Sequence, residues 1–182
     1  MIILLDETDL DCCVGALLLN PEEIIPIGDE LVPDNDLLER LKDQSVIIIG
    51  KNDAYVESVL EVTKDIIAFH HDLNEVDDYS PFYSVVTCYS FCSYAFFHSP
   101  MKHLKHVKEI RNFVEIDLKG SYSNKSIYFM KGMSNIEPLS QEFRDVIING
   151  NYEEIIQKGK ESFKEKLEEI KNNIHIKNIK YH

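Results

Sequence analysis

Short runs of apolar, mostly β-branched residues alternate with amphipathic stretches as far as His71, and this alternation limits the fold of the chain more than any other feature. The runs predict strands at Ile2–Leu5, Glu23–Ile27, Val46–Ile49 and Asp65–Phe69. The stretches between them predict helices at Asp11–Leu19, after an N-cap within Pro33–Asp36, and around Val56–Leu60. Successive β-α-β units close right-handed into a parallel sheet. We therefore expect an α/β fold of three layers, in which helices flank a mostly parallel sheet and the very apolar Val46–Ile49 is central.

After His71 the pattern becomes mainly helical. It predicts an acidic loop at Leu73–Pro81, a buried apolar helix at Phe82–Phe97 and a second helix at Met101–Ile110. Short strands or extended segments are predicted at Phe113–Leu118 and Ser126–Met130, and two closing helices at Ser140–Ile148 and Tyr152–Asn173. The last helix has an apolar stripe of helical period: Ile155, Ile156, Phe163, Leu167 and Ile170. A length of 182 residues predicts a single domain, 1–182, with a helical C-terminal part and no room for a second substrate-binding domain.

Charge and composition exclude several classes of protein. The chain has 19 basic and 32 acidic residues, a net charge of −13, which argues against binding to an extended nucleic-acid backbone. No apolar run approaches the roughly 20 residues of a membrane span, and the N-terminus lacks the basic flank of a signal peptide. The four cysteines include adjacent Cys12 and Cys13 and no Cys-x-x-Cys pair, which favours buried free thiols over disulfides or zinc. We expect a cytoplasmic protein with no membrane partner.

Polar side chains follow three of the predicted strands. They form the clusters Asp6–Asp11, Gly50–Asp53 and Phe69–Asn74. Parallel sheets place ligands at the carboxyl ends of their strands, where carboxylates and imidazoles suit a hard divalent ion such as Mn²⁺. Two such ions about 3.5–4 Å apart would hold a phosphoryl group for in-line attack.

Simpler interpretations of the same residues stay open. Aspartates that precede a helix cap its free N–H groups, and a His-His pair is common where a strand ends with one ring buried. Asp6 is also placed like the nucleophile of a haloacid dehalogenase phosphatase, although Thr8 replaces the second aspartate. A calcium loop fits less well, because the acidic residues lack the alternate spacing of such a loop and its central glycine is missing. The basic cluster Lys102–Lys108 is either a solvated helix face or a guide for an anionic substrate or acidic partner.

Four segments together resemble the DHH phosphoesterase superfamily. Asp9-Leu10-Asp11 before the small-residue stretch Val14–Leu18 is similar to its first motif, and Ile66–Asn74 contains a His-His pair like that of the motif that names the family. Glu115–Leu118 resembles its fourth acidic motif, and Tyr152–Gly159 a helix near the end of its short members. The resemblance touches most of the chain in the family's order.

The resemblance implies a pair of Mn²⁺ ions, with Mg²⁺ as an alternative, that hydrolyse phosphodiester or phosphoanhydride bonds. It implies that His71 faces the substrate phosphate as the catalytic residue. The metal ligands would be Glu7, Asp9, Asp11, His70, and Glu115 or Asp117, with Glu7 in the place of the family's usual histidine.

Besides Glu7, two further positions depart from the family's pattern. Gly50 stands where an acidic residue is expected after the third strand, and Phe69 replaces the aspartate of Asp-His-His. Both replacements remove an anionic oxygen that would offset the repulsion between two dications. We therefore expect a DHH-like fold with a degenerate site, a non-catalytic module that binds a protein partner or a nucleotide. The alternative is a Mn²⁺- or Mg²⁺-dependent phosphoesterase for short oligonucleotides, cyclic dinucleotides or other small phosphorylated ligands.

Overall fold

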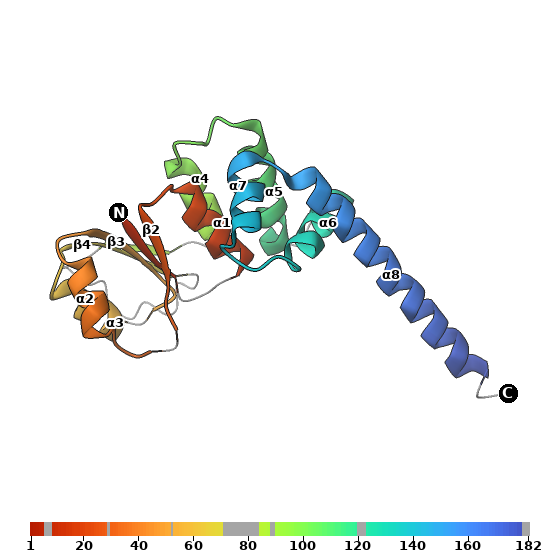
Figure 1. The fold of residues 1–182 in the computed structure, drawn as a ribbon, viewed down its shortest axis with the longest axis horizontal. Coiled ribbons are helices and arrows are strands. Elements are labelled where there is room, and N and C mark those ends of the chain that lie inside the picture. The colour runs from red at the N-terminus through yellow and green to blue at the C-terminus, as the bar shows by residue number, and fades with distance from the viewer. Residues whose placement is uncertain are drawn as a thin grey trace. The chain divides into compact units, whose positions relative to one another are not determined.

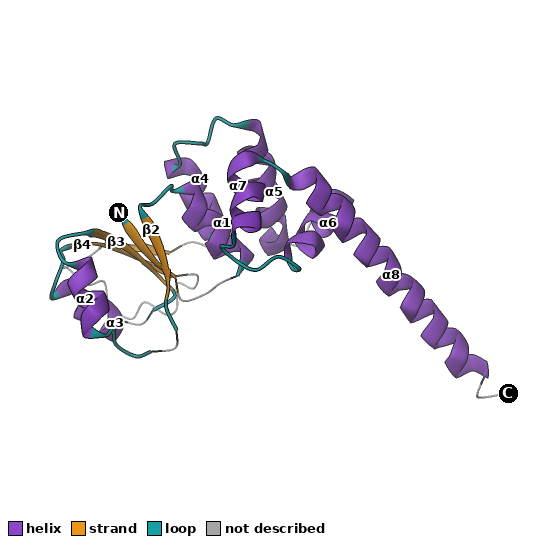
Figure 2. Cartoon of the chain, in the orientation of Figure 1, coloured by secondary structure: helices purple, strands orange, loops and turns teal. Residues whose placement is uncertain are grey.

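The computed structural model describes residues 1–5, 9–28, 30–51, 53–70, 84–87, 90–119 and 123–179. The chain divides into two compact units, Met1–Arg111 and Asn112–His182. The first contains the strands and the second is helical (Figure 2). The single domain expected from the chain length stays a prediction. Among the described residues, no helix combines the length and the apolar character needed to span a membrane.

A five-stranded sheet, parallel throughout, forms the centre of the first unit (Figure 1). Its strands follow the spatial order β2-β1-β3-β4-β5. Their bounds are Ile2–Leu5 for β1, Glu23–Pro26 for β2, Ser45–Ile49 for β3, Asp65–His70 for β4 and Ser84–Thr87 for β5. The α/β class, the parallel sheet and the central place of the third strand are thus confirmed.

Helices cover both faces of this sheet (Figure 1). On one face α2 (Asn35–Leu41) and α3 (Asp53–Leu60) bury Leu41, Val56 and Val59 against alternate residues of the strands. Those alternate residues are Ile2, Leu4, Val46, Ile48, Ile66 and Ala68. On the other face lie α1 (Leu10–Leu18) and α4 (Phe91–His98). The first unit therefore has the three layers expected from the sequence.

Close packing of α1 on α4 depends on Gly15. A Cβ atom at this position would lie 2.5 Å from Phe91 Cδ1 and 3.0 Å from the backbone N of Cys92. Because both neighbours belong to the first turn of α4, a side chain at residue 15 would force the two helices apart. The absence of a side chain at Gly15 thus allows α1 to lie directly against the start of α4.

Three predicted elements after His71 are wrong. Within Phe82–Phe97 the structure has strand β5 and then helix α4, which begins after the N-cap Ser90. Phe113–Leu118 is helical, because α5 runs from Lys105 to Lys119, and Ser126–Met130 lies inside α6 (Asn124–Met133). Composition alone does not separate a buried strand from a buried helix in such short apolar runs. The predicted loop Leu73–Pro81 lies outside the described residues.

The second unit contains α6, α7 (Gln141–Asn149) and α8 (Tyr152–Ile179), together with the last part of α5. Glycines allow α6 and α8 to touch through their backbones. A Cβ at Gly159 would lie 1.8 Å from the carbonyl oxygen of Tyr128, and one at Gly132 would lie 2.2 Å from that of Ile155. The two closing helices are confirmed, and the last is longer than predicted.

Candidate functional site

Asp9 caps α1. Its carboxylate accepts a hydrogen bond of 2.7 Å from the backbone N–H of Cys12, and its backbone carbonyl accepts one of 3.0 Å from that of Cys13. An aspartate at this place satisfies a free N–H group and also interacts favourably with the helix dipole. The side chain is exposed. Asp9 therefore has a complete structural role as an N-cap.

Asp11 is buried, and its carboxylate is held by the start of a different helix. Oδ1 accepts a hydrogen bond of 2.6 Å from Ser90 Oγ and a longer one of 3.4 Å from the N–H of Cys92. Oδ2 accepts one of 2.6 Å from the N–H of Phe91. Ser90 in turn caps α4 by accepting from the N–H of Ser93 at 3.0 Å. The negative charge of Asp11 is thus compensated by three donors and by the positive end of the α4 dipole.

Phe69 and His70 end β4 on opposite faces of the sheet, since successive strand residues alternate. Phe69 is fully buried, and its ring centroid lies 4.7 Å from that of Phe91 and 6.0 Å from that of Tyr94. It therefore packs beside the residues that bind Asp11. His70 is 7% exposed and shares the phase of Ala68, which packs toward α2 and α3. Asp11 and His70 consequently do not face one another.

Gly50 and Lys51 follow β3, next to the point where the strand order reverses between β1 and β3. Gly50 has a φ of 81°, a left-handed conformation that glycine adopts without strain, so the backbone here disfavours the acidic residue expected by the resemblance. Lys51 is buried, and its ammonium donates to the carbonyl oxygens of Gly28 and, at 3.3 Å, of Glu30. It therefore ties the loop after β2 to the end of β3.

The remaining predicted site residues are placed as follows. Glu115 is half-buried on α5 and belongs to the second unit. Asp117 also belongs to α5, but its side chain lies outside the described residues, as do Glu7 and His71 and the residues of the haloacid dehalogenase alternative, Asp6 and Thr8. The segment Glu115–Leu118 is therefore part of a helix and not of the strand that the sequence predicted.

Among the described residues, the side chains at the carboxyl edge of the sheet do not fit a pair of Mn²⁺ ions. Asp11 already accepts three hydrogen bonds, Phe69 offers no donor atom, and His70 points to the other face of the sheet. Across the described ranges, no three His, Cys, Asp or Glu side chains are grouped so that they could hold a metal ion. A cavity of about 470 Å³ lies beside β2 and α2, and its walls include neither Asp9, Asp11 nor His70. The arrangement of the described residues explains stability rather than metal chemistry.

Thiols near this edge are buried. Cys12, Cys13 and Cys92 form no disulfide with one another, and all three side chains are fully buried. Burial, and to a smaller degree the charge of Asp9, raises the pKa of Cys13 to about 12, so this thiol stays protonated at neutral pH. A protonated, buried thiol is neither a nucleophile nor a metal ligand. The interpretation of these cysteines as structural is supported.

Two features were not found from the sequence. One is the buried ammonium of Lys51. This residue belongs to the predicted Gly50–Asp53 cluster, but nothing in the sequence indicated its hydrogen bonds to the carbonyl oxygens of Gly28 and Glu30. The other is a groove in the second unit between α6 and α8, lined by Ile127, Met130, Lys131, Ser134, Phe163, Lys166, Leu167 and Ile170. The apolar stripe of the last helix was the available signal, because it continues past the part of α8 that is buried.

Comparisons of the chain with protein-family models, with curated proteins and with solved structures gave no match.

Proposed function

We propose that the chain is a DHH-phosphoesterase-like module that does not catalyse metal-dependent hydrolysis and that binds a protein partner. One observation carries this proposal: the carboxylate of Asp11, the second aspartate of the stretch that resembles the first motif, accepts hydrogen bonds from Ser90 Oγ and from the N–H groups of Phe91 and Cys92. To bind a metal ion, Asp11 would have to leave the start of α4 without its acceptor, and each buried donor left unpaired costs about 1–3 kcal/mol.

The replaced residues support the same proposal. Phe69 stands where the family has an aspartate, and its ring fills the space beside Phe91 with apolar surface. Gly50 stands where the family has an acidic residue, and its backbone conformation suits glycine. Two anionic ligands are thus absent and a third is occupied by the fold. A cytoplasmic location is part of the proposal and is supported by the buried free thiols of Cys12, Cys13 and Cys92.

The test is thermal unfolding of the full chain with Mn²⁺, with Mg²⁺ and with EDTA, combined with hydrolysis of bis(p-nitrophenyl) phosphate and a cyclic dinucleotide. An ion at a hundred times its dissociation constant would stabilise the protein by about 2.7 kcal/mol, which a melting curve resolves. We expect no rise of the melting temperature that is specific to Mn²⁺ and no hydrolysis above the uncatalysed rate.

The matched variant is Asp9→Ser. Serine keeps an N-cap for α1 and removes the carboxylate, so this variant separates metal binding from capping. Hydrolysis that requires Mn²⁺ and is lost in Asp9→Ser would overturn the proposal in favour of the phosphoesterase.

A further inference from the structure

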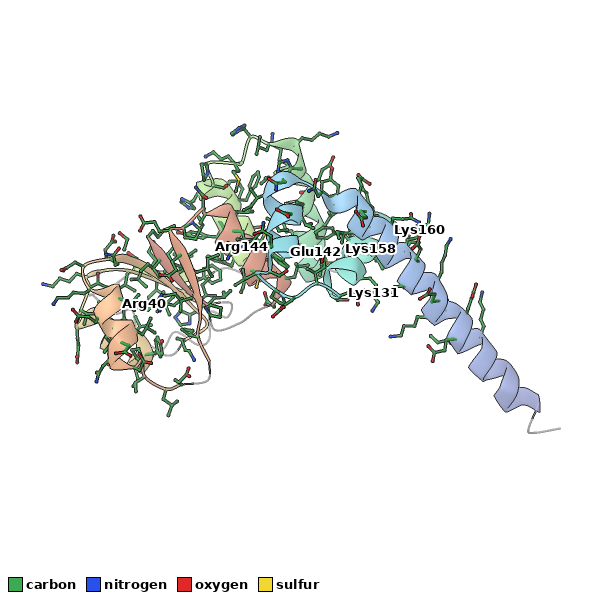
Figure 3. All side chains as sticks on the ribbon, in the orientation of Figure 1. Arg40, Lys131, Glu142, Arg144, Lys158 and Lys160 are labelled. Carbon is green, nitrogen blue, oxygen red and sulfur yellow. The ribbon has the colours of Figure 1, made fainter. Side chains whose placement is uncertain are left out.

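The second unit has an apolar groove with a basic rim. The groove lies between α6 and α8 and has a volume of about 510 Å³. Its apolar walls are Ile127 and Met130 from α6 and Phe163, Leu167 and Ile170 from α8. Lys131 and Lys166 stand at its edge, one from each helix (Figure 3 labels Lys131).

The groove begins where the close contact between α6 and α8 ends. The backbones touch at Gly132 and Gly159, and one turn later the ring of Phe163 lies 6.0 Å from that of Tyr128. Beyond this point α8 continues, and its apolar stripe loses its cover: Phe163, Leu167 and Ile170 are 37%, 42% and 47% exposed. Their spacing of four and three residues forms a seam along one side of the helix. Such a seam is the surface that another helix contacts.

Charged side chains border the seam of α8. Lys166 lies three residues after Phe163 and four before Ile170, so it borders the seam directly. Glu169 follows Lys166 by three residues and lies beside it, farther from the seam, whereas Glu161, Glu165 and Glu168 lie on the opposite side of α8. Because the lining of the groove contains Lys131 and Lys166 and no acidic residue, the groove is basic in a chain whose net charge is −13.

The lysines of the rim have no acidic partner within the described ranges. Neither Lys131 nor Lys166 forms an ion pair there. Lys158, in contrast, contacts Glu154 at 3.0 Å and Glu142 at 3.6 Å (Figure 3 labels Lys158 and Glu142). The basic charge beside the seam thus stays open to carboxylates from another molecule.

We propose that this groove binds an amphipathic helix of a partner protein, whose apolar side chains fill it and whose acidic side chains contact Lys131 and Lys166. The inference deepens the proposed function and rests on it, since it names the surface and the chemistry by which the module binds its partner. The apolar contacts supply affinity, and the lysines select an acidic helix over a basic one.

The charges disfavour the two other occupants. In a symmetric dimer of this chain, the same surface patch would meet itself, so the groove would face two further rim lysines, and none of its lining residues would supply a carboxylate. A bilayer with anionic lipids would attract the lysines but repel the acidic remainder of the chain. A groove between two helices also fits the rounded surface of a third helix better than a plane.

The experiment selects helical peptides of about 18 residues, roughly five turns, from a displayed library against the full chain. We expect the enriched peptides to carry apolar residues at helical spacing with Asp or Glu beside them. One labelled peptide is then titrated against the double variant Lys131→Glu/Lys166→Glu and against Leu167→Glu. Each variant should weaken its binding at least about tenfold. Lys64→Glu, an exposed charge reversal in the first unit, is the matched control and should leave binding unchanged.

Several results would overturn the inference. These are an absence of enriched peptides, enrichment of basic peptides, or binding that the groove variants do not weaken. Sedimentation of the chain with phosphatidylcholine–phosphatidylserine vesicles that Leu167→Glu abolishes would assign the groove to membranes, and a dimer that Leu167→Glu dissociates would assign it to a second copy. Failure of the proposed function is measured separately, because Mn²⁺-dependent hydrolysis is assayed without a peptide and does not involve the groove.

Discussion

The carboxyl edge of the sheet in the first unit and the α6–α8 groove of the second unit differ in how far their side chains are satisfied by the fold. At the sheet edge, Asp11 accepts three hydrogen bonds and Phe69 is fully buried against other aromatic rings. In the groove, Leu167 and Ile170 are nearly half exposed, and the rim lysines form no ion pair within the described part of the chain.

This difference shows that acidic residues at an expected position are weak evidence for a site. A carboxylate that caps a helix already has its hydrogen bonds and its compensating charge, so binding a ligand would first have to break them. Exposed apolar side chains in a row have no hydrogen bonds that binding would break. Covering them releases water from their surface without disturbing the fold. The second unit is therefore where binding to another molecule requires the least rearrangement.

The strongest test of the carboxyl edge of the sheet is Phe69→Asp, which places here the aspartate of the DHH motif that this segment resembles. We expect the free energy of unfolding to fall by at least about 5 kcal/mol, because the variant loses a buried ring and places a charge in apolar surroundings. Urea unfolding followed by circular dichroism measures this loss.

Phe69→Leu is the control, since it keeps apolar volume and should cost about 1.5 kcal/mol. Mn²⁺ should not restore the stability of Phe69→Asp. If Mn²⁺ raised the free energy of unfolding of Phe69→Asp, the carboxyl edge of the sheet would form a metal site. Its side chains would then be no more satisfied by the fold than those of the groove.

The next largest effect is expected for Asp11→Ala. The change leaves Ser90 Oγ and the N–H groups of Phe91 and Cys92 without their acceptor in the interior, which should cost about 3 kcal/mol. Asp9→Ala removes an exposed cap and should cost about 1 kcal/mol. Equal losses for both variants, measured by chemical unfolding, would contradict the role given to Asp11 as the buried link between α1 and α4.

Much of the first unit follows from its sequence because local signals agree there. The β-branched runs at Ile2–Leu5 and Val46–Ile49 match their strands, and Asp34 caps α2 as predicted. The prediction failed where the window was too short. Phe113–Leu118 alternates like a strand, but Val107, Ile110 and Val114, spaced by three and four residues, already indicate the helix that the structure has.

The candidate site was less predictable than the fold. The partners of Asp11 lie 79 to 81 residues away, and no local pattern indicates that α4 begins beside it. The groove has the same origin, since it needs the contact of α6 with α8 through Gly132 and Gly159. The sequence does show the apolar stripe on the last helix, and its residues were predicted correctly. It does not show that the second half of the stripe is exposed.

A smaller effect is expected from the buried thiol of Cys13, which makes the free energy of unfolding depend on pH. Its pKa is raised from 9.0 to about 12, mainly by burial and also by Asp9. The unfolded chain therefore loses this proton first, and stability falls as the pH rises from 9.0 to about 12. The slope from this group is at most about 1.4 kcal/mol per pH unit. Urea midpoints should decline less steeply in Cys13→Ala.

Burial also raises the pKa of Tyr94, so Tyr94 contributes to the same decline of stability at high pH. Tyr94→Phe is the control that measures this second contribution separately from that of Cys13. The native protein should also resist thiol labelling until it unfolds. Rapid labelling of Cys13 in the folded chain would contradict the burial of this thiol and the stability of the packing around it.

The smallest effect should come from the same kind of substitution in the open region. Leu167→Glu adds a charge to a side chain that is 42% exposed, so we expect a loss of less than about 1 kcal/mol. Ile155→Glu, on the buried part of the same helix, should cost more than about 3 kcal/mol. Thermal melts of both variants measure the difference. If Leu167→Glu were as damaging as Ile155→Glu, the groove would be a structural interior and its loss of peptide binding would reflect unfolding. If the variant stays folded, the exposed seam contributes little to the stability of the chain alone, and covering it is left to a partner.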